Sequence, residues 1–196
     1  MASLSLRESH PVELVDRTGR PLGVRTVEEA HQAPGRLHRA FSVVLTDDCG
    51  RILLQRRSAA KTRFASLWAN ACCGHPSPEQ SVPDAANQRI REELGLGPVT
   101  LADAGVYLYY AEDPIAGRVE FEYDHVLVGR VPSGVSLAPD PNEVAELRWL
   151  NRRQLENSLG ASPEGYAPWL GGVIARLARQ DSNADPAEPA GPSGGR

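Results

Sequence analysis

Five side chains suited to binding a divalent metal ion stand at three places along this sequence. His31 and His38 lie near the amino terminus, His75 lies further on, and Glu120 and Glu122 are two residues apart. Alternate side chains of a β-strand share one face, so the two glutamates would point the same way if their segment is a strand. Imidazole and carboxylate groups suit Zn²⁺, Mn²⁺ or Mg²⁺ in different degrees. From residue types alone, a five-ligand metal site and a set of ordinary polar residues both remain open.

A cysteine lies two residues before one of these histidines, in the stretch Trp68-Ala-Asn-Ala-Cys-Cys-Gly-His-Pro76. A thiol close to a cation and to backbone amides can have a lowered pKa and become reactive. Cys73 is therefore a candidate for chemistry at this site. The alternative interpretation is a small buried residue that only packs.

The segment from Gly74 to Gly95 resembles a Nudix box, a loop–helix–loop that presents carboxylates to a divalent cation bound by a diphosphate. It ends in the matching sequence Arg91-Glu-Glu-Leu-Gly95. Of the acidic residues of the box, only Glu92 and Glu93 remain. A pyrophosphate hydrolase needs several carboxylates there to hold metal ions and activate water. Three characteristic positions of the box are replaced, by Gln80, Gln88 and Arg89.

Three motifs in register resemble the type 1 isopentenyl-diphosphate isomerases. They are Arg36-Leu-His38-Arg-Ala-Phe-Ser42, Trp68-x-Asn70-x-x-Cys73-Gly-His-Pro76 and Glu120-x-Glu122, and the similarity runs from about residue 10 to about residue 180. The resemblance implies a Nudix-like fold of the α/β (α+β) class, with a mixed sheet sandwiched between helices. It also implies interconversion of isopentenyl diphosphate and dimethylallyl diphosphate by metal-dependent 1,3-allylic proton transfer.

The same resemblance assigns roles to individual residues of this sequence. The catalytic groups would be Cys73, Glu122 and Tyr110. The ligands of a divalent ion (Mn²⁺, Zn²⁺ or Mg²⁺) would be His31, His38, His75, Glu120 and Glu122. Glu93 would hold a Mg²⁺ that arrives with the substrate diphosphate, and Trp169 would cover the hydrocarbon end. The basic residues that face the diphosphate would be Arg57, Lys61 and Arg89.

Two positions depart from the family pattern. The family commonly has a lysine four residues before the first histidine ligand, where this chain has Val27, and Arg25 is a candidate replacement. An asparagine usually separates the two strand glutamates, where this chain has Phe121. Neither change removes a group that handles protons, so they bear on substrate affinity more than on reaction type.

Two other functions compete with the isomerase. A Nudix pyrophosphohydrolase is favoured by the fold but opposed by the lost carboxylates of the box. A non-catalytic prenyl-diphosphate binding protein needs no acid–base pair, so the presence of both Cys73 and Glu122 opposes it.

The elements that must position these groups follow from periodicity and turn residues. We expect strands over residues 11–15, 40–45, 51–55, 101–110, 119–131 and 146–150. The clearest helix covers residues 81–94, ending at Gly95, and shorter helices cover residues 27–31, 152–159 and 168–179. Residues 47–50 would form a hairpin turn.

Composition excludes several other classes of protein. The 196 residues carry a net charge of −4 and no apolar run long enough to cross a membrane, so neither nucleic acid nor membrane is an expected partner. Three cysteines, two of them adjacent, indicate reduced thiols in the cytoplasm. We expect one domain over residues 1–180, acting as a monomer on a small prenyl diphosphate. Residues 181–196, rich in Pro, Gly and Ala, should be a disordered tail.

Overall fold

A computed structural model describes residues 7–183 of the chain. Within these residues, nine strands join into one mixed sheet. The strands are β1 (Pro11–Val15), β2 (Pro21–Thr26), β3 (His38–Thr46), β4 (Ile52–Arg57), β5 (Trp68–Ala69), β6 (Cys72–Gly74), β7 (Leu101–Asp113), β8 (Arg118–Arg130) and β9 (Val144–Leu150). The helices are α2 (Val27–Ala30), α3 (Val82–Leu94), α4 (Arg152–Ala161), a 3₁₀ turn (Pro163–Gly165) and α5 (Leu170–Asn183).

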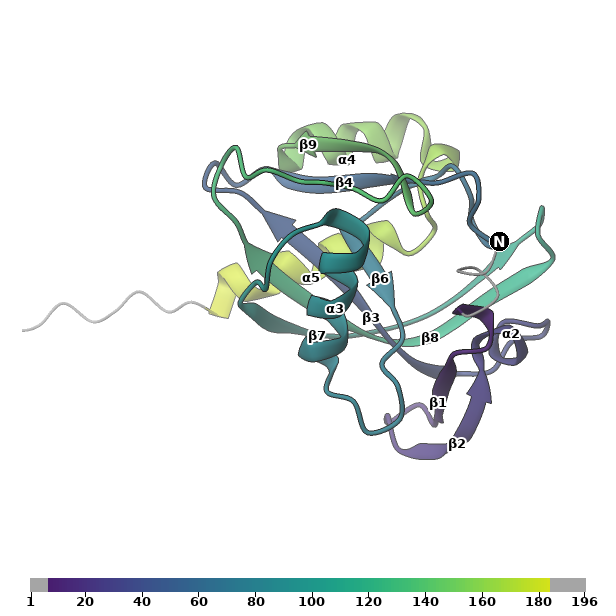
Figure 1. The fold of residues 1–196 in the computed structure, drawn as a ribbon. Coiled ribbons are helices and arrows are strands. Elements are labelled where there is room, and N and C mark those ends of the chain that lie inside the picture. Colours follow the sequence, from purple (N-terminus) through teal and green to yellow (C-terminus); the bar gives the residue numbers. More distant parts are fainter. Residues whose placement is uncertain (1–6, 184–196) are drawn as a thin grey trace, which may run out of the picture.

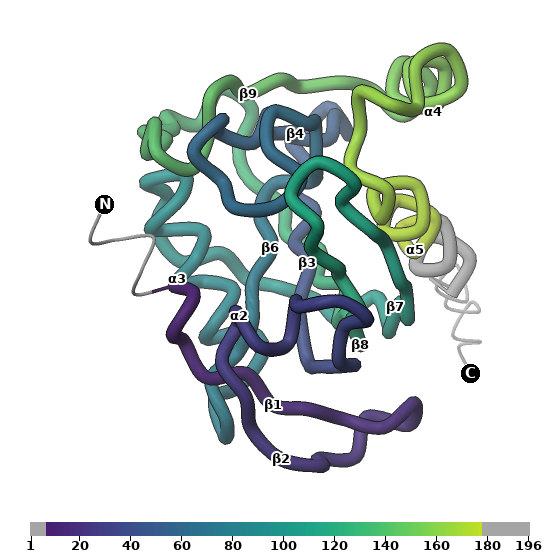
Figure 2. The backbone as a smooth tube through the Cα atoms, turned by 90° about the vertical axis from the view of Figure 1, so that its right-hand side faces the viewer, coloured from purple at the N-terminus to yellow at the C-terminus, as the bar shows by residue number. Residues whose placement is uncertain are grey.

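Strand β3 is buried on both faces, and each face has its own hydrophobic core. Phe41, Val43 and Leu45 pack with Ile90 and Leu94 of α3. The alternate residue Val44 packs on the other side, with the buried apolar side chains of α5. Figures 1 and 2 show α3 and α5 on opposite sides of the strands. The expected class, a mixed sheet sandwiched between helices, is confirmed.

The most extensive pairing of β3 is not with β4, the strand that follows it in sequence. The expected turn after β3 is present, because Asp47 accepts backbone N–H bonds from Cys49 and Arg51. Beyond this turn, however, β3 and β4 pair only at Thr46 and Ile52. Strand β3 instead runs parallel to β8 from the His38–Glu122 pair onward. Strand β4 pairs with β9.

The ends of α3 agree with the sequence prediction. Ser81 caps its first turn by accepting a hydrogen bond from the Asp84 backbone N–H. Gly95 ends the helix with φ 62°, and a Cβ there would lie 2.7 Å from the Ala138 carbonyl oxygen, so glycine is required for both reasons. Helix α3 therefore ends where the Nudix-like segment ends.

Other elements differ from expectation. The strands β2, β5 and β6 were not foreseen, and β6 is the strand that carries Cys73. Helix α5 continues to Asn183, three residues into the segment expected to be disordered. The rest of that prediction concerns residues 184–196, outside the described part. Among residues 7–183, no helix combines the length and the apolar character that a membrane span demands.

Candidate active site

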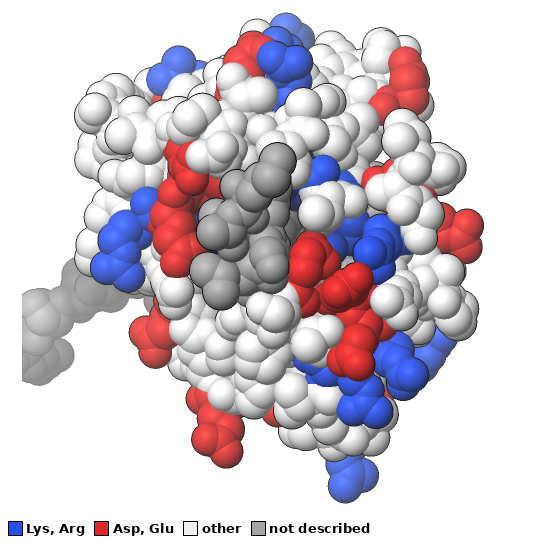
Figure 3. Space-filling view, turned by 45° about the vertical axis from the view of Figure 1, so that its right-hand side comes forward, with Lys and Arg blue, Asp and Glu red and all other residues white. Residues whose placement is uncertain are grey.

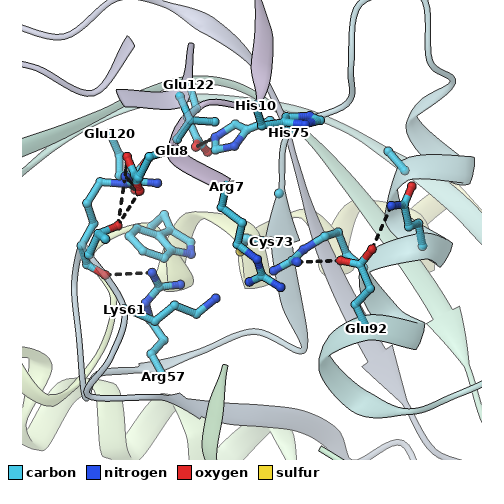
Figure 4. A pocket seen from close by; sticks show the side chains of 18 of the residues that line it. Arg7, Glu8, His10, Arg57, Lys61, Cys73, His75, Glu92, Glu120 and Glu122 are labelled. Atoms are coloured by element: carbon cyan, nitrogen blue, oxygen red, sulfur yellow. Dashed lines mark hydrogen bonds and ion pairs between the residues drawn. The ribbon is translucent and has the colours of Figure 1, made fainter. Parts of the chain in front are cut away.

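A cavity of about 600 Å³ opens between the sheet, α3, the loop after β4 and the segment before β1. Its lining includes eight of the twelve residues to which the resemblance assigns roles: Arg57, Lys61, Cys73, His75, Arg89, Glu120, Glu122 and Trp169. Acidic and basic side chains gather next to each other on the face shown in Figure 3. Figure 4 shows how the labelled side chains point into this cavity.

The five predicted metal ligands converge at one end of the cavity. Strand β8 carries Glu120 and Glu122, and His38 begins β3 opposite Glu122. His31 follows α2, and His75 follows β6, which pairs with β3. The imidazole centroids lie 4.6–5.1 Å apart. One ligand atom from each of the five residues falls within 4.8 Å of all the others.

The hydrogen bonds of the histidines fit a metal ion at this point. The Nδ1 atoms of His31 and His38 lie 2.6 and 2.7 Å from the carbonyl oxygens of Val27 and Arg36. A proton on Nδ1 leaves the Nε2 lone pair free to face the other ligands. Nε2 of His38 is buried without a hydrogen-bond partner in the described residues. Burial, together with His31, lowers the pKa of His38 to about 3, so its imidazole is neutral and able to bind a cation.

The two glutamates of this group have opposite acidities. Burial, then the charges of Glu120 and Asp124, raise the pKa of Glu122 well above its usual value. Burial acts the same way on Glu120, but His31 and Arg63 outweigh it and lower that pKa. Two adjacent carboxyl groups whose pKa values are driven apart are typical of acid–base sites.

The tyrosine beside Glu122 is Tyr109, and the prediction of Tyr110 is wrong in placement. Tyr109 is buried, and its hydroxyl donates a 2.6 Å hydrogen bond to Oε2 of Glu122. Tyr110 is 48% exposed and donates to Glu112 instead. Tyr109 pairs with Glu122 across the β7–β8 ladder. A shift of one residue moves a side chain to the other face of a sheet, and only the pairing register could have decided between the two tyrosines.

Cys73 faces the cavity from β6, opposite Ser42 of β3. Its Sγ lies 3.5 Å from the Ser42 hydroxyl and 3.2 Å from Nδ2 of Asn70. We had expected nearby cations to lower the thiol pKa. The protein groups act in the other direction, because burial, and then the charge of Asp124, raise the pKa of Cys73 to about 12. The protein groups around Cys73 therefore favour its protonated form.

Asn70 connects this thiol to the aromatic wall of the cavity. Its Nδ2 also donates to the carbonyl oxygens of Val43 and Cys72, at 3.1 and 2.9 Å. Its Oδ1 accepts a 3.1 Å hydrogen bond from Nε1 of Trp169. These partners fix which way the buried amide points. Asn70 belongs to one of the three motifs, but the resemblance assigned no role to it.

Trp169, which the resemblance places over the hydrocarbon end of the substrate, is buried and lines the wall of the cavity. Its ring stacks on Tyr109 with centroids 5.8 Å apart and meets Phe64 edge-on at 5.1 Å. The Arg57 guanidinium lies 5.6 Å above the same ring. Tyr109 and Trp169 both line the cavity and offer an apolar surface to a ligand.

The other end of the cavity is cationic, and two buried carboxylates organise it. Lys61 and Arg89 both contact Glu93 and Glu143. Burial opposes ionisation of Glu93, but Lys61 and Arg89 lower its pKa to about 2. Arg57 lines the same cavity, with two of its nitrogens bound to carbonyl oxygens of Arg63 and Phe64.

Two cationic residues of the cavity lining, Arg7 and Arg63, and the buried Glu143 were missed in the sequence. Arg7 contacts Glu143, and Arg63 donates to Glu120 at 3.2 Å. Nothing in their residue types or spacing distinguishes them from surface charges. Arg25, the suggested replacement for the missing lysine, is exposed and donates to the Val24 carbonyl oxygen, so it lies outside the cavity that Val27 lines.

The chain matches known proteins over most of its length. Residues 36–175 match the family model of the NUDIX domain. An isopentenyl-diphosphate Delta-isomerase of Nocardia farcinica is 53% identical over 164 residues, covering 84% of this chain and 92% of that protein. The enzyme of the same name from Streptomyces griseus is 42% identical over 167 residues, covering 85% and 83%.

A solved structure from Deinococcus radiodurans superposes with a TM-score of 0.65 at 19% identity, over 87% of this chain and 98% of that one. At this identity the likeness supports the fold alone. The family model and the two close relatives go further, and the resemblance inferred from three motifs is confirmed. The chain belongs to the NUDIX domain family and, within it, to the isopentenyl-diphosphate Delta-isomerases.

Proposed function

We propose that this protein interconverts isopentenyl diphosphate and dimethylallyl diphosphate by proton transfer between the substrate and two side chains, Cys73 and Glu122. The observation that carries this proposal is that the Cys73 thiol and the Glu122 carboxyl group line one cavity together with the aromatic side chains of Tyr109 and Trp169. The cavity also has a cationic end suited to a diphosphate.

The reaction needs an acid and a base rather than a nucleophile. A proton added to the terminal carbon of the substrate alkene leaves a tertiary carbocation. Loss of a proton from the neighbouring allylic carbon then gives dimethylallyl diphosphate, so no net proton is consumed. Cys73 and Glu122 exchange the roles of acid and base between the two directions. Tyr109, hydrogen-bonded to Glu122, holds that carboxyl group in place.

The wall of the cavity suits a cationic intermediate. The face of an aromatic ring attracts positive charge, by about 2 kcal/mol when the pair is desolvated. Trp169 presents such a face beside Tyr109. Enclosure also keeps water from adding to the carbocation.

The metal-ligand group fits a divalent ion held by His31, His38, His75, Glu120 and Glu122. Such an ion, Mn²⁺, Zn²⁺ or Mg²⁺, would supply a fixed positive charge that orients Glu122 and favours its ionised form. Glu93 would hold a Mg²⁺ that enters with the diphosphate, while Arg57, Lys61 and Arg89 form charge-assisted hydrogen bonds to the phosphate oxygens.

The contacts of α3 count against pyrophosphate hydrolysis. Gln80 lies near Gln88, which donates to Glu92, while Arg89 forms ion pairs with Glu92 and Glu93. These side chains take up the remaining carboxylates of the box instead of adding to them. A binding protein without catalysis remains the other alternative, and it gives no reason for a proton-bearing thiol facing the cavity.

We expect the protein to act in the cytoplasm as a monomer on this small substrate, without nucleic acid or membrane as partner. A net charge of −4 offers no broad attraction for a polyanion. Light scattering of the purified protein checks the oligomeric state, since a dimer would double the measured mass.

The deciding experiment is NMR of the purified protein with isopentenyl diphosphate and Mg²⁺ in D₂O. Dimethylallyl diphosphate carrying deuterium is the expected product. Substrate that is bound but not deuterated would indicate a binding protein without catalysis. Release of phosphate would indicate a pyrophosphohydrolase.

A further inference from the structure

The segment just before β1 contributes Arg7, Glu8 and His10 to the cavity lining and is hydrogen-bonded to the protein on both sides. On one side Glu8 accepts hydrogen bonds from Thr62 and Arg63, at 2.8 and 2.9 Å. On the other side Nε2 of His10 lies 3.4 Å from the Ser77 hydroxyl. The carbonyl oxygen of His10 also accepts a 2.9 Å bond from the Val27 backbone N–H. Arg7, Glu8 and His10 therefore form part of the cavity lining.

This segment delivers one guanidinium group into the cationic end. Figure 4 shows the Arg7 side chain pointing into the cavity. Nη1 of Arg7 contacts Glu143, the carboxylate that also binds Lys61 and Arg89. Three cationic side chains, from three separate parts of the chain, thus meet at one buried acid.

Arg7 has more hydrogen-bonding capacity than the protein uses. A guanidinium offers five N–H donors. Within residues 7–183, the one hydrogen bond of this guanidinium goes to Glu143. The side chain keeps 30% of its exposed area, so its other donors can reach a ligand in the cavity. Burial, and then the charge of Arg89, lower the pKa of Arg7.

One position of the cavity lining lacks the cation that the family commonly has there. Val27 lines the cavity and carries no charge, and Arg25 lies outside it. The remaining N–H donors of Arg7, together with those of Lys61 and Arg89, would be satisfied by an anion that carries several oxygen atoms on two covalently linked atoms. A diphosphate has this form.

We propose that Arg7 is a substrate-binding residue of this chain. The segment before β1 thereby supplies a further cation that binds the diphosphate. The proposal rests on the proposed function for the identity of the diphosphate ester. It goes beyond that function by placing part of the binding site on the amino-terminal segment.

The test compares three variants of the full metal-loaded chain: Arg7→Gln, Arg7→Lys and Arg25→Gln. Binding of inorganic pyrophosphate with Mg²⁺ is measured by titration calorimetry, and kcat and KM are measured with isopentenyl diphosphate. We expect Arg7→Gln to weaken pyrophosphate binding and to raise KM by about tenfold or more, with kcat within about threefold of wild type. Arg7→Lys should lose less affinity, and Arg25→Gln should match wild type.

Two outcomes would overturn the proposal. Arg7→Gln could bind pyrophosphate as wild type does while its Tm falls. This result would mean that Arg7 only stabilises the fold through its ion pair with Glu143. Arg25→Gln could lose as much affinity as Arg7→Gln, which would indicate general electrostatic attraction rather than a contact. Failure of the proposed function is a separate result, because wild-type protein would then bind pyrophosphate but produce no deuterated dimethylallyl diphosphate.

Discussion

The two ends of the cavity are built in different ways. At the metal-ligand end, most side chains project from or adjoin strands β3, β6 and β8, whose pairing is continuous. At the cationic end, the side chains come from the loop after β4, from α3 and from the segment before β1. Strand pairing fixes the first set, whereas ion pairs with Glu93 and Glu143 hold the second.

This difference separates turnover from affinity. Groups that handle protons must be held within a fraction of an ångström, and a sheet with fixed register provides that. Groups that bind a diphosphate can exchange one anionic partner for another, and paired cations on loops are suited to that exchange. Changes at the metal-ligand end should therefore reduce kcat, and changes at the cationic end should raise KM.

The largest expected effect is at the proton-handling pair. Cys73→Ala and Glu122→Gln each remove one of the two proposed acid–base groups, so kcat should fall by about 10²–10⁴-fold or more. Deuterium incorporation from D₂O, followed by NMR, measures the loss. Circular dichroism should show an unchanged fold for both variants. Full activity in either one, with the substitution verified by mass spectrometry, would disprove the mechanism.

Removal of divalent metal ions should also nearly abolish turnover, because Glu122 would lose the charge that orients it. Chelation followed by dialysis, with the metal content measured by mass spectrometry, tests this. Activity should return on adding Mn²⁺, Zn²⁺ or Mg²⁺, and the comparison shows which of these ions the site can use. Undiminished turnover by a verified metal-free sample would remove the five-ligand group from the mechanism.

The sequence predicted the metal-ligand end better than the cationic end, for a physical reason. Glu120 and Glu122 share a face because strand side chains alternate, and that rule needs no knowledge of the partner strand. The choice between Tyr109 and Tyr110 does need the partner, because the β7–β8 register decides which one meets Glu122. Arg7 and Glu143 meet only through the tertiary fold, being 136 residues apart, so no local pattern could have joined them.

The two tyrosines offer a matched pair for the next prediction. Tyr109→Phe removes a hydrogen bond to a carboxyl group, worth about 1.5–3 kcal/mol, so kcat should fall by about 10- to 100-fold. Tyr110→Phe removes an exposed hydroxyl that contacts Glu112, and kcat should not change. Steady-state kinetics of both variants measure the contrast. Equal losses of kcat in the two variants would mean that the face of β7 on which a tyrosine lies does not decide whether it acts in the reaction.

A smaller effect is expected at the cationic end. Lys61→Ala removes one cation from Glu93 and Glu143, and the diphosphate loses one charge-assisted contact. KM should rise by about tenfold, with kcat changed less. A Lys61→Ala variant with normal KM and low kcat would contradict the assignment of diphosphate binding to the cationic end and of proton transfer to the metal-ligand end.

The smallest prediction concerns Asp113, which joins the two ends. It stands at the end of β7, close to the hairpin turn before β8, and its Oδ2 accepts a 2.6 Å hydrogen bond from the Phe64 backbone N–H in the loop after β4. Its Oδ1 accepts bonds from the backbone N–H groups of Ile115 and Ala116. An asparagine has one acceptor oxygen for these two sets of donors. Asp113→Asn should therefore leave the Phe64 N–H unpaired and lower the free energy of unfolding by about 1–3 kcal/mol at pH 7.

The pH dependence of this loss follows from the acidity of Asp113. Burial alone would raise its pKa, but the backbone N–H bonds outweigh burial and lower the pKa below the ordinary 3.8. A carboxylate whose pKa is lowered in the folded state stabilises the fold at pH values above 3.8, and this stabilisation is lost as the pH falls through the lower folded value. The difference in Tm between wild type and Asp113→Asn should thus be full at pH 7 and should shrink in acid. A difference that stays constant down to the acid transition would mean that the ionised carboxylate does not hold the loop to the sheet.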